Sequence, residues 1–323
     1  MEQRKLQIKD ARKNINGVGL TLIVYYMIMN TVVVLSMLAD LCVYLFKAAA
    51  DGTALNFDDL LNRLTEFALS SGWGYILSIV VGVVILLLWK GKRIFPEIFA
   101  SGKPMSLGVF GMLLCVFLLP QALLQFYAPA LEWLLNEMGY SATAALEAAT
   151  VNADTVSMFL YVAILGPVAE ELLFRGLLIH MLRPRGKQAA IVISAIVFGL
   201  FHGNVIQIPF AFGVGLVLGY VTVEYSIIWA IVLHIINNFV LSDLMGRLEA
   251  IEPEAASVLY VIILAVAVIV SIVLLIVKRS EIKDYLRQNK VGAVAWRGLV
   301  SSVTMWIFAA MMLISALLTI TRI

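Results

Sequence analysis

Apolar runs close to twenty residues long recur along the whole chain and decide what it can fold into. About 20 such residues are enough for an α-helix to cross the hydrocarbon core of a bilayer. Inside that core every backbone N–H and C=O must be paired within the protein, which leaves only helices and closed barrels. The short alternating segments of a barrel are not seen. With 62% hydrophobic and 14% charged residues, the chain is predicted to be all-α, a polytopic transmembrane bundle of about eight or nine spans.

Nine apolar segments are the candidate spans, with approximate ranges 17–46, 73–89, 106–127, 155–182, 188–201, 206–223, 227–241, 257–277 and 298–320. The first lacks a small-residue cleavage site, so we interpret it as a retained span rather than a signal peptide. Gly215 and Gly219 in the sixth predict close helix packing. Residues 51–71 and 129–153 are expected to be amphipathic or loop segments at the membrane surface. An eight-span arrangement, with one terminal run lying on the surface, stays open.

Lysine and arginine are concentrated in alternate loops. The basic segments are the N-terminus, 90–103, 183–187 and 278–297, and the acidic ones are 51–71, 128–154 and 242–256. Because basic loops remain cytoplasmic, we predict an integral membrane protein with a cytoplasmic N-terminus, located in the plasma membrane of a bacterium.

One predicted span, with the sequence GPVAEELLFRGLL at 166–178, contains charges that membrane helices rarely carry. Each charge costs at least ~2.5–3.5 kcal/mol at the bilayer centre, so such residues pair or face a polar cavity. Glu171 and Arg175 stand at i,i+4 and can neutralise each other. Glu170 is turned away by roughly 100° and is the freer carboxylate. Pro167 is expected to kink the helix and open space beside the glutamates.

Two more polar clusters lie on later spans: Phe198 and His202 in FGLFHGN, and His234 and Asn238 in HIINNF. Measured along each helix from its cytoplasmic end, the depths are ~20, ~22, ~15 and ~21 Å for Glu170, His202, His234 and Asn238. The four side chains are therefore predicted to share one buried site.

The motifs EExxxR, FxxxH and HxxxN, in this order on separate apolar segments, resemble the CPBP family of intramembrane proteases. That family is also called the CAAX protease and bacteriocin-processing, or Abi, family. The resemblance covers roughly residues 155–245, which we expect to be the catalytic core. Residues 1–154 are then N-terminal spans and interfacial segments, and residues 246–323 are C-terminal spans.

A glutamate beside a histidine in a shielded cavity is suited to activating water, and the resemblance implies a hydrolase similar to the type II CAAX prenyl endopeptidase. The candidate catalytic residues are Glu170, Glu171, His202, His234 and Asn238, supported by Arg175 and Phe198. Glu170 is the expected general base, with His202 positioning the water. His234 and Asn238 would donate to the oxyanion, and Glu171 with Arg175 would brace the helix.

A metal is the main alternative within the enzyme hypothesis. Glu170, His202 and His234 would suit a catalytic zinc with one open position, and the family has been labelled metalloprotease. No HExxH is present, however, and the glutamate mechanism requires no cofactor. We expect the lipid bilayer and a membrane peptide or protein substrate as partners, and no nucleic acid.

Two functions outside proteolysis stay open. The chain is alternatively a non-proteolytic scaffold or a bacteriocin self-immunity protein that binds a membrane-protein partner. A proton-linked transporter would predict an internal repeat, and no convincing repeat is seen. Within the protease hypothesis, a prenylated CAAX protein and a bacteriocin-type peptide precursor are both possible substrates.

Overall fold

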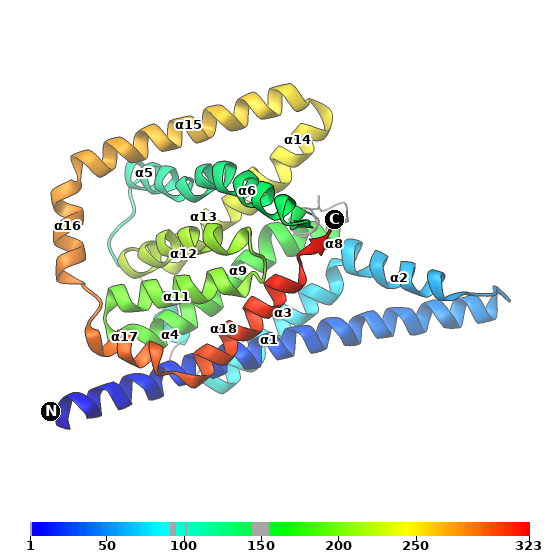
Figure 1. Cartoon of the computed structure of the whole chain (residues 1–323), viewed down its shortest axis with the longest axis horizontal. Coiled ribbons are helices and arrows are strands. Elements are labelled where there is room, and N and C mark those ends of the chain that lie inside the picture. Colours follow the sequence, from blue (N-terminus) through cyan, green and yellow to red (C-terminus); the bar gives the residue numbers. More distant parts are fainter. Residues whose placement is uncertain (1, 91–94, 101, 144–154) are drawn as a thin grey trace.

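The computed structural model describes residues 2–90, 95–100, 102–143 and 155–323. Over these residues the chain is a bundle of helices with one pair of two-residue strands (Figure 1). Within the described part, seven helices are long and apolar enough to cross a membrane, or eight if a bent pair near the C-terminus is one span. The predicted all-α polytopic fold is confirmed.

The elements in chain order are α1 Glu2–Ala50, α2 Phe57–Ser70, α3 Gly72–Lys90, α4 Phe95–Ile98, α5 Leu107–Phe117, α6 Leu119–Glu137, β1 Tyr140–Ser141, α8 Val156–Phe159, η2 Leu160–Leu165, α9 Gly166–Glu171, η3 Leu172–Leu178, α10 Ile179–Leu182, η4 Arg183–Arg185, α11 Lys187–Phe201, α12 Gln207–Glu224, α13 Ile227–Ile235, η5 Ile236–Leu244, α14 Met245–Ile251, α15 Pro253–Val277, α16 Arg279–Gln288, α17 Ala293–Val300, α18 Val303–Leu318 and β2 Thr321–Arg322. The segments η2, η3 and η5 are π-helical, and η4 is a 3-10 turn.

Each predicted span corresponds to helical structure, but three segments differ from expectation. The fifth is α11, whose 15 residues are shorter than a span-length helix. The ninth is divided into α17 and α18, which meet at an angle of 62°. The acidic stretch 242–256, expected as a loop, is mostly helix, because η5 continues directly into α14.

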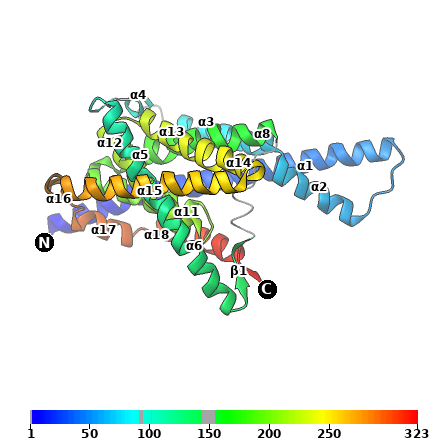
Figure 2. The same cartoon turned by 90° about the horizontal axis from the view of Figure 1, so that it is seen from above.

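α1 forms one long side of the bundle. It has 49 residues, or ~74 Å at 1.5 Å per residue. Its N-terminal half packs against α3, α17 and α18, burying a helical face that contains Ile15, Val18 and Leu22. Its other half forms a hairpin with α2 that extends away from the bundle (Figures 1 and 2). Arg63 of α2 makes two hydrogen bonds of 2.8 Å to Asp40 of α1, which fixes the hairpin.

The centre of the bundle contains α11 and α12, which pack closely along their length. Two glycines of α12 allow this approach. A Cβ added at Gly215 would lie 3.0 Å from the Cα of Ala195, and one at Gly219 would lie 3.1 Å from the side chain of Ile191. The close packing predicted from the glycine spacing is confirmed.

The basic segments gather at one end of the molecule. There the buried carboxylate of Glu224 contacts Lys187 at 2.8 Å, Lys103 at 2.9 Å and the hydroxyl of Tyr285 at 3.1 Å. The N-terminus, α16 and α17 lie at this end, and α2 and the C-terminus at the other (Figure 1). This arrangement agrees with the charge pattern, and the side of the membrane that each end faces stays a prediction.

The helix α15 forms a wall opposite the central helices. It packs against α5 and α6 and turns back along α14. This places α6 and α15 across from α13 and η5, and the space between them is the site described next.

Candidate active site

The polar residues expected to meet do share one cavity. Its volume is about 860 Å³. It lies between α6, α9, α11, α12, α13 to α14, and α15. Its polar lining residues are Gln121, Gln125, Glu170, His202, Gln207, His234, Asn237, Asn238, Ser242, Glu249, Ser257 and Tyr260.

The two adjacent glutamates occupy different environments. The side chain of Glu171 is 0% exposed, and its Oε1 lies 3.1 Å from Nη1 of Arg175 and 2.9 Å from Nδ1 of His234. The side chain of Glu170 is 30% exposed and lines the cavity. The expected division between an internal ion pair and a freer carboxylate is therefore present.

Arg175 is fully buried beneath the site. Its guanidinium forms the ion pair with Glu171 and lies 4.1 Å from the ring centroid of Phe198. A cation over an aromatic face is attracted by the negative face of the ring. The ring of Phe198 in turn contacts His202 and His234 edge to face, with centroid separations of 4.9 and 5.9 Å. Phe198 thus packs against the site as predicted and separates the arginine from the cavity.

His202 lies at the junction of two helices, where it ends α11. Its Nδ1 lies 2.9 Å from the carbonyl oxygen of Phe198. Gly203 follows with φ of +55°, a left-handed conformation that glycine adopts readily. The side chain of Asn204 then accepts from the N–H groups of Ile206 and Gln207. This Gly–Asn turn joins α11 to α12.

His234 links the two glutamates. Its Nδ1 bonds to Glu171, and its Nε2 lies 3.7 Å from Oε2 of Glu170. An imidazole held at Nδ1 by a buried carboxylate has its Nε2 directed at the reacting groups, as in the catalytic triads of hydrolases.

Asn238 has a partner that the motif did not predict. Its Nδ2 donates to the carbonyl oxygen of Val162 at 3.0 Å. In η2 each N–H bonds to the carbonyl oxygen five residues earlier, as the N–H of Gly166 does to Tyr161 O. By the same spacing, the carbonyl oxygen of Val162 would accept from the N–H of residue 167. That residue is Pro167, which has no N–H. The Asn238 amide therefore replaces the hydrogen bond that the proline cannot make, and its second N–H is left for the cavity.

Within the described residues, no group of three His, Cys, Asp or Glu side chains could hold a metal ion. Glu170 and His234 approach each other, but His202 does not complete a set with them. Whether the reaction needs zinc stays a prediction for experiment.

A polar cluster opposite the glutamates was missed. Gln121 and Gln125, on the third predicted span, reach Tyr260 of α15. The sequence contained the necessary information, because polar side chains are rare in apolar membrane spans and often functional. Two amides one helical turn apart in such a span could have been noticed in the same way as the glutamates. Both helices lie outside the segment that the family motifs covered.

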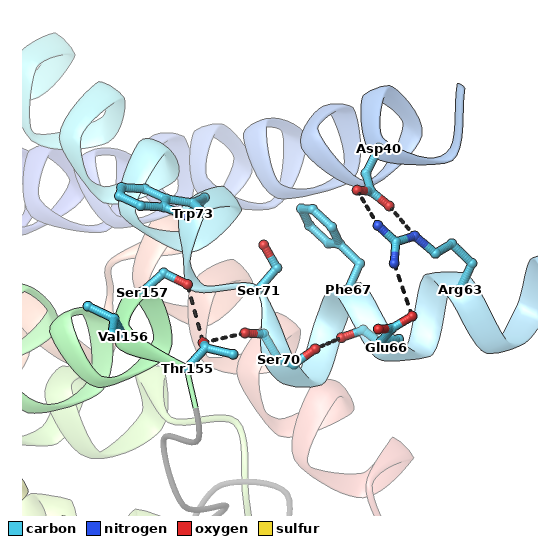
Figure 3. A pocket seen from close by; sticks show the side chains of 10 residues that line it. All are labelled: Asp40, Arg63, Glu66, Phe67, Ser70, Ser71, Trp73, Thr155, Val156 and Ser157. Carbon is cyan, nitrogen blue, oxygen red and sulfur yellow. Dashed lines mark hydrogen bonds and ion pairs between the residues drawn. The ribbon is translucent and has the colours of Figure 1, made fainter. Parts of the chain in front are cut away.

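A second pocket, of about 420 Å³, lies at the base of the α1–α2 hairpin (Figure 3). Its polar side chains satisfy one another: Arg63 bonds to Asp40 and Glu66, and Thr155 bonds to the carbonyl oxygen of Ser70. These contacts join the hairpin to the start of the span that carries the glutamates.

Residues 152–240 match the family model described as "Type II CAAX prenyl endopeptidase Rce1-like". This segment contains all three motifs and every candidate catalytic residue. Over this segment the chain is similar to the CAAX protease family. None of the curated proteins and none of the solved structures matches the chain. The family match supports a CAAX-type intramembrane protease in general, acting on a membrane-associated peptide substrate.

Proposed function

We propose that this protein is an intramembrane endopeptidase that hydrolyses a peptide bond with water activated by Glu170. The observation that best supports this proposal is that a partly exposed glutamate and two histidines line one cavity among the spans. Both histidines contact an acceptor through Nδ1.

Those contacts decide what each ring can do. A neutral imidazole has one N–H donor and one acceptor nitrogen. With Nδ1–H directed at Phe198 O, His202 presents an unprotonated Nε2 that accepts from water. With Nδ1–H directed at Glu171, His234 presents Nε2 to Glu170.

Charge balance supports different roles for the two carboxylates. In a low-dielectric interior, charges need partners. Arg175 offsets Glu171, and a proton on Nε2 of His234 would offset Glu170. In that state Glu170 is the ionised base, and His234 donates to developing negative charge.

The reaction then follows with its atoms balanced. Water positioned by Nε2 of His202 loses a proton to Glu170 as its oxygen attacks the scissile carbonyl carbon. The oxyanion accepts from Nε2–H of His234 and from the second amide N–H of Asn238. When the C–N bond breaks, the leaving nitrogen takes the proton from Glu170, which regenerates the carboxylate.

The test compares the full-length wild type with Glu170→Gln and His202→Ala in detergent. Glu66→Gln, which alters a carboxylate outside the cavity, is the matched control. The substrates are prenylated CAAX peptides and unprenylated membrane peptides, with and without chelator, and products are identified by mass spectrometry. We expect both site variants to lose cleavage, while the control and the chelated wild type retain it.

Two results would contradict this mechanism. Cleavage that survives Glu170→Gln would exclude this base, and cleavage lost to chelator and restored by zinc would require a metal. Cellular function retained by Glu170→Gln, in the absence of any cleavage, would support the scaffold or immunity role instead.

A further inference from the structure

The cavity extends well beyond the residues that perform the chemistry. Its wall follows one side of α13, η5 and α14, from His234 through Asn238 and Ser242 to Glu249. At 1.5 Å per residue this is ~20 Å, the length of about six residues of extended chain. The cavity ends beside the turn between α14 and α15, where Ala256 and Ser257 line it.

The opposite wall carries a hydrogen-bonding cluster that the mechanism does not use. Gln121 and Gln125 stand one turn apart on α6, and both amides donate to the hydroxyl oxygen of Tyr260, at 2.6 and 3.3 Å. A phenol oxygen can accept while its O–H donates. Because the oxygen already accepts from two amides, and no described residue accepts the O–H, Tyr260 has a free donor at the cavity.

A peptide substrate inside a membrane needs hydrogen-bond partners for its backbone, and this cluster can provide them. A bond can be hydrolysed only where the substrate is extended, and unpaired backbone groups in a bilayer cost several kcal/mol each. Neutral amides and a phenol can pair with both C=O and N–H groups of an extended backbone. Polar residues in apolar spans commonly mark such a substrate path.

We propose, building on the proteolytic function above, that this cluster is a subsite for the extended backbone of the peptide substrate. Tyr260 donates to a backbone carbonyl of the substrate, and Gln121 and Gln125 are positioning residues that orient the phenol. The helices α6 and α15 lie outside the family-matched residues 152–240.

The binding test uses the full-length Glu170→Gln protein in nanodiscs, which prevents turnover. The probe is a fluorescein-labelled peptide of leucine, alanine and lysine, about twelve residues long, with a C-terminal carboxamide. Adding Tyr260→Phe should raise its Kd by about three- to tenfold, the effect of one lost hydrogen bond. Adding Tyr285→Phe, which removes a hydroxyl bonded to Glu224 outside the cavity, should leave the Kd unchanged.

A further variant tests whether the amides act through the phenol. Gln125→Leu should weaken binding in the protein that retains Tyr260 but have no added effect in Tyr260→Phe. Equal Kd values with and without Tyr260→Phe, or no binding of the probe, would each overturn the proposal.

A cleavage assay separates this subsite from the proposed function. In otherwise wild-type protein, Tyr260→Phe should raise KM and leave kcat unchanged. Cleavage that requires Glu170 but ignores Tyr260→Phe refutes the subsite alone. Probe binding that requires Tyr260, without any cleavage by the wild type, supports the subsite and refutes the proteolytic function.

Discussion

The hydrogen bond between Asn238 and Val162 leads to a prediction that distinguishes structure from catalysis. Asn238→Ala should leave the carbonyl oxygen of Val162 without a partner among the spans. Pro167→Ala should restore the missing backbone N–H at the position that serves this oxygen. The second substitution is therefore expected to compensate for the first.

The magnitude follows from the contact. Loss of one partner of a buried hydrogen bond costs about 1–3 kcal/mol, although side-chain hydrogen bonds between membrane helices average only about 0.6 kcal/mol. We expect Asn238→Ala to lower the free energy of unfolding by about 1–2 kcal/mol. With Pro167→Ala already present, the same change should cost about 1 kcal/mol less.

The measurement is a double-mutant cycle, with unfolding in mixed micelles followed by far-UV circular dichroism. Peptide cleavage is assayed on the same four proteins. If Asn238 also donates to the oxyanion, stability will recover in the double variant while cleavage stays low. Strictly additive losses of stability would refute the reasoning, because they would show that the two residues do not serve the same carbonyl.

Three further variants test the surroundings of the site. Arg175→Leu leaves the buried carboxylate of Glu171 without its cation and should cost about 3–5 kcal/mol, seen as lost folded protein in size-exclusion chromatography; adding Glu171→Gln should recover part of it. Asn204→Ala removes the acceptor at the start of α12 and should cost about 1 kcal/mol, seen as a lower Tm. Hydrogen bonding to Glu224 raises the pKa of Lys103, so this contact is intact below the ordinary lysine pKa and is lost as the pH rises through the raised value. Because Lys103 is 63% exposed, Lys103→Met should lower the Tm only slightly. The difference in Tm between wild type and variant should be equal at about pH 6 and about pH 9. It should vanish at higher pH, where the lysine is neutral.

Much of the site followed from the sequence because polar residues in apolar spans are few. The spacing of Glu171 and Arg175 predicted their ion pair, and the depths of Glu170, His202 and His234 placed them in one cavity. The ion pair follows from helical spacing, and the shared depth follows from the helical rise within apolar spans. Neither prediction requires knowledge of side-chain rotamers.

The rest depended on backbone geometry that hydrophobicity does not encode. An apolar run has the same composition whether it is straight or bent, so the angle between α17 and α18 was not predictable. The bond from Asn238 to Val162 requires the π-helical register of η2. The cluster around Tyr260 joins helices far apart in sequence and could be recognised only once they were packed together.

The π-helical segments have a consequence for how this site tolerates insertions and deletions. In η2, η3 and η5 the chain follows a five-residue bonding period instead of four, and such turns often occur at functional sites. Removing one residue from η5 would let it return to an ordinary α-helix with little rotation of the chain beyond it. One residue removed from a regular α-helix such as α12 would instead turn everything beyond the deletion by about 100°. In both cases the span would remain apolar and long enough to cross the bilayer, but only the deletion in α12 would change the face that lines the cavity. The π-helical segments are therefore the positions at which a relative of this chain can be one residue shorter and keep the same cavity lining.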